Sequence, residues 1–356
     1  MRPAARRNGR CVTSARSDAI DATEYIGWPG CRNGRGLRVR PPVRCAVVTP
    51  VVFFGPHGTF AEEALLSQPD LAARTRVPIS SIPDILAAVD AGEYEVGLVP
   101  IENSIEGSVS VTLDTLAFER DLLIQREVDL PISMGLFVKP GVKLAEIRQV
   151  LSFPIAAAQC RGFLKRKLPQ ATFVAANSTA DAAAAVARSK RMDQAAIGNE
   201  LAARLNGLKV LAADIEDHPE NQTRFVLVGH GIPAPTGHDK TTIVCFQRAD
   251  RPGSLLAMLQ EFAARRINLT KLESRPTKRS LGDYCFFIDF EGHINDELVA
   301  DCLRTLAAKV AHVKYLGSYP VAGLDAPARR TAVTKAWRDA DKWLGELRAQ
   351  VRALDA

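Results

Sequence analysis

Short apolar runs alternate with amphipathic stretches along the first half of the folded chain. Val51–Phe54 is continuously apolar, as in strands buried on both faces, and residues 96–99 form a second such run. Residues 60–66 and 82–91 carry apolar positions at helical spacing. Strands that alternate with helices predict a parallel α/β sheet, which binds its ligand beyond the carboxyl ends of its strands.

The pattern continues into a second group of elements. We expect strands at residues 122–128, 132–138, 150–153, 172–174 and 195–198, and helices at residues 111–118, 155–168, 178–187 and 199–205. The chain should cross between the groups near residues 127–131 and within 199–222, before the run 226–228 returns to the first group. We therefore predict two α/β lobes, arranged as in periplasmic binding proteins, with a ligand site in the crevice between them.

A separate module follows the two lobes. Residues 230–239 are rich in Gly and Pro and form a predicted linker. Beyond it we expect strands at residues 241–247, 269–274, 284–290 and 313–319, and helices at residues 254–265 and 297–309. This βαββαβ order predicts a ferredoxin-like domain over residues 240–322. Residues 323–356 have the apolar spacing of an amphipathic helix, which would pack on its own chain or on a second subunit.

Positive charge is concentrated at the N-terminus. Residues 1–45 carry ten Arg and three acidic residues, a net +7, so the rest of the 356-residue chain is near −1 within a total of +6. A nearly neutral body gives no reason to expect nucleic-acid or membrane binding. Residues 1–46 lack helical or strand periodicity, so we expect a disordered extension. Our hypothesis is that the assigned start lies upstream of the natural one, with folding beginning near Val47.

Cysteine and histidine usage limits the chemistry. The seven cysteines form no Cys-x-x-Cys pair, which indicates a reducing, cytoplasmic setting without structural disulfides. The six histidines lack metal-ligand spacing, so we expect no metal site. No apolar run approaches the roughly 18 to 20 residues that span a bilayer.

Three polar stretches lie where predicted strands meet the crevice. They are Gly55-Pro56-His57-Gly58-Thr59-Phe60, Pro100-Ile101-Glu102-Asn103-Ser104 and Asn221-Gln222-Thr223-Arg224-Phe225. In the first, Thr59 and Glu62 have capping-box spacing, and the free N–H groups of the helix start would suit an anion. The last offers an amide, a hydroxyl and a guanidinium at the start of a strand. Each stretch alone also fits an ordinary turn.

Together, the three stretches resemble the three signatures of the prephenate dehydratase family. The βαββαβ module is similar to the ACT regulatory domain that follows in that family. Arg251-Pro252-Gly253-Ser254-Leu255 and Glu273-Ser274-Arg275-Pro276 stand where its members carry PGAL-like and ESRP motifs. The resemblance implies a lyase with a catalytic domain over residues 47–229, which converts prephenate to phenylpyruvate with loss of CO2 and the ring hydroxyl. It implies no cofactor, because aromatisation drives the elimination.

The family match also implies the site residues. The catalytic group would be Thr223, Arg224, Glu102, Asn103 and Ser104. Thr223 would orient and polarise the departing hydroxyl, while Arg224 would bind a carboxylate or brace the loop from outside. The substrate contacts would be Gly58, Thr59, Phe60, Ser152, Gln159 and Phe225. The chain reads Ser152-Phe153-Pro154-Ile155 where the family usually has Ser-His-Pro-Gln, so the usual His and Gln are missing.

For the ACT module, the resemblance implies an amino-acid effector, normally L-phenylalanine, bound between subunits of a homodimer or homotetramer. The effector contacts would be Asp250, Pro252, Gly253, Ser254, Leu255, Glu273 and Ser274. Gly253 permits close backbone approach, and the helix that begins at Ser254 offers N–H groups to a carboxylate. The same turn is also an ordinary helix start, and we expect Arg275 to be structural.

Two other functions fit parts of the pattern. Arogenate dehydratase performs the same elimination on the amino-acid analogue, and the residues do not distinguish the two substrates. Solute-binding proteins share the two-lobed cleft without catalysis, although the attached ACT module argues against that class.

Overall fold

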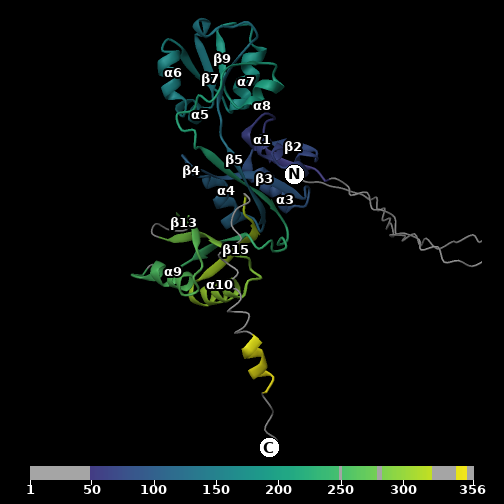
Figure 1. The fold of residues 1–356 in the computed structure, drawn as a ribbon, viewed down its shortest axis with the longest axis vertical. Helices are drawn as coiled ribbons and strands as arrows, with labels where there is room; N and C mark the ends of the chain where they lie inside the picture. Colours follow the sequence, from purple (N-terminus) through teal and green to yellow (C-terminus); the bar gives the residue numbers. More distant parts are fainter. Residues whose placement is uncertain (1–48, 248–250, 279–282, 323–341, 351–356) are drawn as a thin grey trace, which may run out of the picture. The chain divides into compact units, whose positions relative to one another are not determined.

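The computed structural model describes residues 49–247, 251–278, 283–322 and 342–350, which form α/β lobes followed by a βαββαβ domain (Figure 1). The predicted fold class is confirmed. Our predictions for residues 1–46, for Asp250 and for residues 323–341 lie outside the described part of the chain. Of the C-terminal stretch, residues 342–348 are helical. No described helix has the length and apolar character needed to cross a membrane.

The first lobe is built on a six-stranded sheet in the order β2-β1-β3-β11-β5, with β4 beside β3. Its strands are β1 (Val51–Phe54), β2 (Arg76–Ile79), β3 (Val96–Asn103), β4 (Gly107–Ser108), β5 (Leu123–Pro131) and β11 (Gln222–Gly229). Its helices are α1 (Phe60–Leu66), α2 (Pro69–Ala72), α3 (Ile82–Asp90) and α4 (Ser110–Asp114), which continues as a π-helix (Thr115–Glu119). Strands β2, β1 and β3 are parallel, whereas β11 returns antiparallel between β3 and β5.

The second lobe has a five-stranded sheet in the order β10-β6-β9-β7-β8. Its strands are β6 (Gly135–Val138), β7 (Gln149–Ser152), β8 (Thr172–Ala175), β9 (Gln194–Gly198) and β10 (Lys209–Ala212). Its helices are α5 (Pro154–Ala158), α6 (Arg161–Lys167), α7 (Thr179–Arg188) and α8 (Glu200–Leu205), with a 3-10 turn at Leu144–Glu146. After the second-lobe elements, β11 returns to the sheet of the first lobe.

The ACT-like domain is an antiparallel sheet in the order β13-β14-β12-β15. Its strands are β12 (Asp239–Phe246), β13 (Leu269–Pro276), β14 (Tyr284–Glu291) and β15 (His312–Pro320), and its helices are α9 (Ser254–Ala264) and α10 (Glu297–Lys309). Phe262 of α9 and Leu306 of α10 share a buried cluster with Ile243 and Ile288 of the sheet. The βαββαβ prediction is therefore confirmed.

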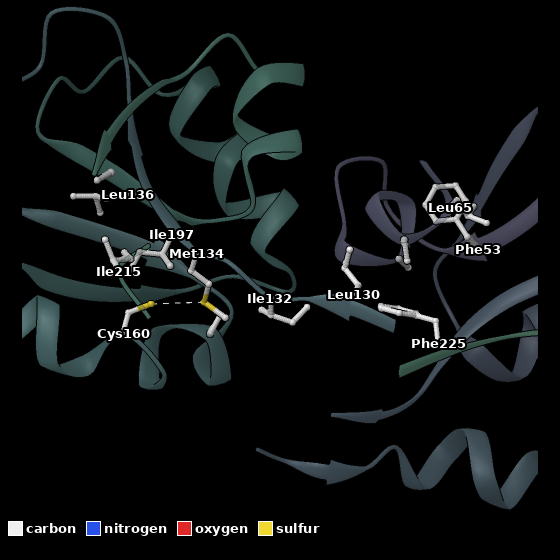
Figure 2. Close-up of a cluster of buried hydrophobic side chains, with 14 of the residues drawn as sticks. Phe53, Leu65, Leu130, Ile132, Met134, Leu136, Cys160, Ile197, Ile215 and Phe225 are labelled. Atoms are coloured by element: carbon white, nitrogen blue, oxygen red, sulfur yellow. Dashed lines mark hydrogen bonds between the residues drawn. The ribbon is translucent and has the colours of Figure 1, made fainter. Parts of the chain in front are cut away.

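One hydrophobic cluster joins the two lobes. Figure 2 shows Phe53, Leu130 and Phe225 of the first lobe at one end, and Ile197 and Cys160 of the second lobe at the other. Between them lie Ile132 and Met134, in the segment that leads from β5 to β6. This continuous core holds the segment between β5 and β6 in place, and Ile132 and Met134 of that segment also line the cleft.

Two local predictions are wrong. Residues 155–168 form two helices, α5 and α6, because the chain breaks between Ala158 and Arg161. The capping box of α1 is absent, since the Thr59 hydroxyl donates to the Phe54 carbonyl and no side chain caps the helix. The capping prediction for α7 is confirmed: the Ser178 hydroxyl accepts a hydrogen bond from the Asp181 N–H at 2.9 Å.

Candidate functional site

A cleft of about 590 Å³ is lined by residues of both lobes. Apolar side chains dominate its walls, with Phe54, Phe60 and Phe225 from the first lobe and Phe153 and Ile155 from the second. Its polar lining is made of Thr59, Ser80, Asn103, Glu106, Gln159, Asn177, Ser178, Thr179, Asp181, Asn221 and Thr223. No Lys, Arg or His is among the described residues that line this cleft. An anionic ligand would therefore have to be bound by uncharged donors.

Thr223 is held in the cleft by Asn103. Strands β3 and β11 pair with Thr223 opposite Asn103, and the Asn103 amide donates to the Thr223 hydroxyl oxygen at 2.9 Å. The same amide donates to the Asn221 side-chain oxygen, also at 2.9 Å. Because Thr223 accepts this hydrogen bond, its own O–H remains able to donate toward the cleft. Two signature residues predicted to act together are thus brought together.

The hydrogen-bond network continues into the second lobe through the predicted Gln159 and ends at Glu106, which the sequence analysis missed. The Asn221 amide, which is 1% exposed, donates to Gln159 at 3.1 Å. Gln159 donates in turn to the Glu106 carboxylate at 3.0 Å. Glu106 is one of two carboxylates in the cleft lining, and it follows the Glu102–Ser104 stretch by two residues. Only that closeness to the second polar stretch pointed to it.

Glu102 and Arg224 face away from the cleft. They pair across β3 and β11 next to Asn103 and Thr223, and successive side chains of a strand point to opposite faces. Glu102 lies 3.2 Å from the Lys271 ammonium of the ACT-like domain. Neither Glu102 nor Arg224 lines the cleft. Of the five predicted catalytic residues, Thr223 and Asn103 lie in the cleft wall. Glu102 and Arg224 point toward the ACT-like domain instead.

Arg224 is a bridge between the domains. Its guanidinium donates to Glu127 at 2.8 Å, to Asp289 at 2.7 Å and to the Tyr319 hydroxyl at 2.7 Å. Burial alone would lower its pKa, but interactions with Tyr319, Asp289 and Glu127 raise the pKa of Arg224 well above its ordinary value. Since all of its strong partners are side chains outside the cleft, the bracing alternative agrees with the structure better than carboxylate binding does.

Two donors of the Gly-rich turn are already occupied. The Gly58 N–H donates to the Glu62 carboxylate at 2.7 Å, and the Thr59 hydroxyl donates to the Phe54 carbonyl at 3.0 Å. Glu62 also accepts from Arg76. Burial acts to raise the pKa of Glu62, but the hydrogen bond from Gly58 and those from His57 and Arg76 hold it below its ordinary value. The Gly58 N–H and the Thr59 hydroxyl are therefore used within the protein and are not offered to a ligand.

Some of the other predicted residues line the cleft, and the rest make hydrogen bonds within the protein. Phe60, Gln159 and Phe225 line the cleft. Ser152 is fully buried and donates to the Ile197 carbonyl at 3.0 Å, which links β7 to β9. Ser104 does not line the cleft, but its hydroxyl donates to the Asn221 side-chain oxygen at 3.3 Å and helps to position Asn221.

The predicted effector residues lie on two parts of the ACT-like domain. Pro252, Gly253, Ser254 and Leu255 form the turn and the start of α9, with Gly253 at φ +85°. Glu273 contacts the first lobe through the Ser108 hydroxyl, whereas Ser274, the next residue of β13, is exposed. Arg275 binds Asp114 of α4 at 2.8 Å, as expected of a structural residue.

A cleft between two α/β lobes, followed by a βαββαβ domain that packs on the strands of that cleft, defines a two-lobed ligand-binding protein with an attached ACT-like module. Sequence profiles of known families match in the same order: "Prephenate dehydratase" over residues 51–232 and "ACT domain" over residues 241–308. The chain belongs to the prephenate dehydratase family.

Named relatives agree over most of the chain. The chain is 45% identical to the prephenate dehydratase of Mycolicibacterium vanbaalenii over 285 residues, which covers 76% of this chain and 90% of that protein. The crystal structure of the Arthrobacter aurescens prephenate dehydratase in complex with L-Phe is 40% identical, with a TM-score of 0.76, and the match covers 84% of this chain and 99% of that one. A structure described as GqqA, a novel type of quorum quenching acylases, is 30% identical, with a TM-score of 0.69 and coverages of 79% and 100%.

Proposed function

We propose that the protein converts prephenate to phenylpyruvate in the inter-lobe cleft and that L-phenylalanine regulates it through the ACT domain. The observation that carries this proposal is the Thr223 hydroxyl, held by Asn103 in a cleft without a cationic side chain among its described lining. Family membership and the L-Phe complex of a 40% identical relative support both parts.

The chemistry explains why uncharged donors suit this cleft. The bond between the ring and its carboxylate breaks and its electron pair enters the ring, while the C–O bond breaks and the departing oxygen takes a proton and leaves as water. A cation beside the leaving carboxylate would stabilise its charge and oppose the release of neutral CO2. The Thr223 O–H would instead donate to the oxygen on which charge develops. Glu106 belongs to the same network and is linked to this group through Gln159 and Asn221.

Acyl transfer, the activity in the description of GqqA, has weaker support here. A hydroxyl nucleophile needs a base to accept its proton. Thr223 has the Asn103 amide group as its hydrogen-bond donor, and an amide cannot take that role.

The first experiment measures phenylpyruvate formation by the full chain and its Thr223→Ala variant, with and without L-phenylalanine. We expect kcat to fall by on the order of 10² or more, because the variant loses a hydrogen bond that strengthens as the hydroxyl departs. Thr223→Ser keeps the hydroxyl and is the matched control, with kcat within about tenfold of the wild type. A near-normal kcat for Thr223→Ala would remove this residue from the mechanism.

Substrate preference is tested in the same assay. Comparison of kcat/KM for prephenate and arogenate distinguishes the two dehydratases, and tight binding of prephenate without turnover would instead favour a binding protein. We expect prephenate to be the better substrate and L-phenylalanine to change its rate.

A further inference from the structure

The N-terminus of helix α7 opens on the cleft. Ser178, Thr179 and Asp181 belong to the cleft lining, and the helix spans the ten residues Thr179–Arg188. The Ser178 cap accepts the Asp181 N–H, but the N–H groups of Thr179 and Ala180 donate to no described residue. Unpaired N–H groups at a helix start carry partial positive charge and attract anions. This feature alone would not define a site.

The Thr179 side chain provides an independent observation. The residue is 7% exposed and lines the cleft, yet its hydroxyl has no hydrogen-bond partner among the described residues. Its oxygen is not one of the fully enclosed side-chain atoms that lack a hydrogen-bond partner, so it is open to the cleft. Two neighbouring hydroxyls are used within the protein, since Ser178 donates to Asp181 and Thr59 donates to Phe54. The Thr179 hydroxyl is therefore a donor that is available to a ligand in the cleft.

The described cleft lining has no cationic side chain, and this decides which carboxylate of prephenate can bind at α7. Prephenate carries one carboxylate that leaves as CO2 and a second, on its pyruvyl side chain, that stays in the product. Strong binding of the first would oppose its loss, whereas binding of the second orients the substrate in the ground state and in the transition state alike. A neutral hydroxyl and the start of a helix can hold a retained carboxylate without placing a full positive charge in the cleft.

We propose that the N-terminus of α7 binds the pyruvyl carboxylate of the substrate through the Thr179 hydroxyl and the N–H groups of Thr179 and Ala180. The departing hydroxyl then lies at Thr223 on the opposite lobe, so the substrate spans the cleft. The inference rests on the proposed function. It assigns this role to α7 instead of the Gly-rich turn, whose Gly58 N–H is occupied by Glu62.

The test compares two competitive inhibitors that differ only by a carboxylate: phenylpyruvate and phenylacetone. In Thr179→Val, which keeps the shape of the side chain, phenylpyruvate should bind about ten- to a hundredfold more weakly, as expected for a lost hydrogen bond to a charged group. Phenylacetone should bind within about twofold of its wild-type affinity. The KM for prephenate should rise by a factor similar to that for phenylpyruvate, because the lost contact acts on substrate and transition state alike.

Three further variants sharpen the result. Thr179→Ser retains the hydroxyl and should restore phenylpyruvate binding, and Thr172→Val, on edge strand β8 outside the cleft, should change neither inhibitor. Asp181→Asn keeps an acceptor for Ser178 but removes a negative charge, so phenylpyruvate should bind a few-fold more tightly. If Thr179→Val weakens phenylpyruvate binding and Asp181→Asn strengthens it, the N-terminus of α7 is an anion site.

The proposal is overturned if Thr179→Val leaves phenylpyruvate binding unchanged, or if both inhibitors weaken equally. Failure of the wild type to convert prephenate would instead contradict the proposed function. Calorimetric titration with phenylpyruvate would then still decide the inference. Binding that Thr179→Val weakens supports it, and wild-type protein that does not bind phenylpyruvate overturns it.

Discussion

Glu62 and Glu63 are neighbours in helix α1, but their carboxylates lie in opposite electrostatic environments. Glu62 is 4% exposed and accepts hydrogen bonds from Gly58, His57 and Arg76, which hold its pKa below the ordinary value of 4.5 against the effect of burial. Burial raises the pKa of Glu63, whose main partner is the uncharged Asn199 amide at 2.7 Å. Folding therefore stabilises the ionised form of Glu62 and destabilises the ionised form of Glu63.

Replacing each acid by Gln should therefore change stability in opposite directions at pH 7. Glu62→Gln should lower the free energy of unfolding by about 1–3 kcal/mol, because it loses charge-assisted hydrogen bonds. Glu63→Gln should raise it by about 1 kcal/mol, or about 2–4 °C in Tm, because the amide still accepts from Asn199 without a buried charge. Thermal unfolding of both variants at a series of pH values measures the effect.

The pH dependence follows from the signs of the two shifts. A lowered folded pKa gives Glu62 a contribution that is present above pH 4.5 and is lost as the pH falls through its folded pKa. A raised folded pKa gives Glu63 a penalty that is absent below pH 4.5 and develops as the pH rises through its folded pKa. Both differences from wild type should thus shrink as the pH falls from 7 toward 4. Equal effects at pH 4 and pH 7 would contradict this account.

At the residue scale, the sequence could predict which stretches meet but not which side chains face the cleft. The sequence predicts Thr223 and Phe225 at the cleft and leaves Arg224 between binding a carboxylate there and bracing the loop from outside. Strand β11 instead begins at Gln222, so the pleat turns Thr223 and Phe225 to one side and Arg224 to the other. Thr179 could not be predicted, because an unpaired hydroxyl is visible only once its neighbours are placed.

At the scale of elements, paired strands β3 and β11 carry the cleft on one face and the interdomain cluster of Arg224 on the other. We expect Arg224→Met to lower the free energy of unfolding by about 3 kcal/mol, because it leaves the buried Asp289 carboxylate without its cation, whereas Glu127 keeps Lys240 at 2.9 Å. Denaturant unfolding measures this loss. The KM for prephenate should change less than it does in Thr179→Val.

Arg126→Met is the control for this prediction. Arg126 lies on β5 and pairs with Asp70, whose side chain is 59% exposed, so the loss should be at most about 1 kcal/mol. If Arg224 bound a substrate carboxylate instead, Arg224→Met would raise KM strongly while leaving the unfolding midpoint at the wild-type value.

Strands with an apolar run could be predicted from the sequence, and strands without one could not. Strands β1 and β9 carry the buried apolar runs that predicted them, and the edge strands β5, β8, β13 and β15 could be predicted too. Strands β2 and β10 could not be predicted, because their sequences lack a strong apolar pattern. The same reason applies to β4, which has only two residues.

At the scale of the whole chain, the order of modules could be predicted, but their shared core could not. Phe287 and Tyr319 of the ACT domain belong to one buried cluster with Val226 and Val228 of the catalytic sheet. A linker rich in Gly and Pro gave no sign of this contact. Because apolar burial is the main source of stability, the two modules should unfold together in a single transition.

Gly317 tests this coupling, because it is where β15 comes closest to β5. Its φ of +137° favours glycine, and a Cβ there would lie 2.6 Å from the Ile124 carbonyl oxygen and 3.0 Å from the Ile124 nitrogen. Gly317→Ala should therefore cost about 2 kcal/mol or more, through overpacking and backbone strain, and should push the ACT sheet away from the catalytic sheet. Differential scanning calorimetry should show a lower Tm and a transition that splits in two.

Gly237→Ala in the linker separates the two contributions to that loss. Gly237 also has a positive φ, +85°, but an added Cβ would meet no atom within 4 Å, so its variant should lose only the backbone contribution of about 1 kcal/mol and keep a single transition. Both variants place Ala at a positive φ, but the one at Gly317 adds the contact with Ile124 to a more strained backbone. A Gly317→Ala protein that unfolds in one step, at the temperature of the Gly237→Ala protein, would mean that the close approach of β15 to β5 does not couple the domains.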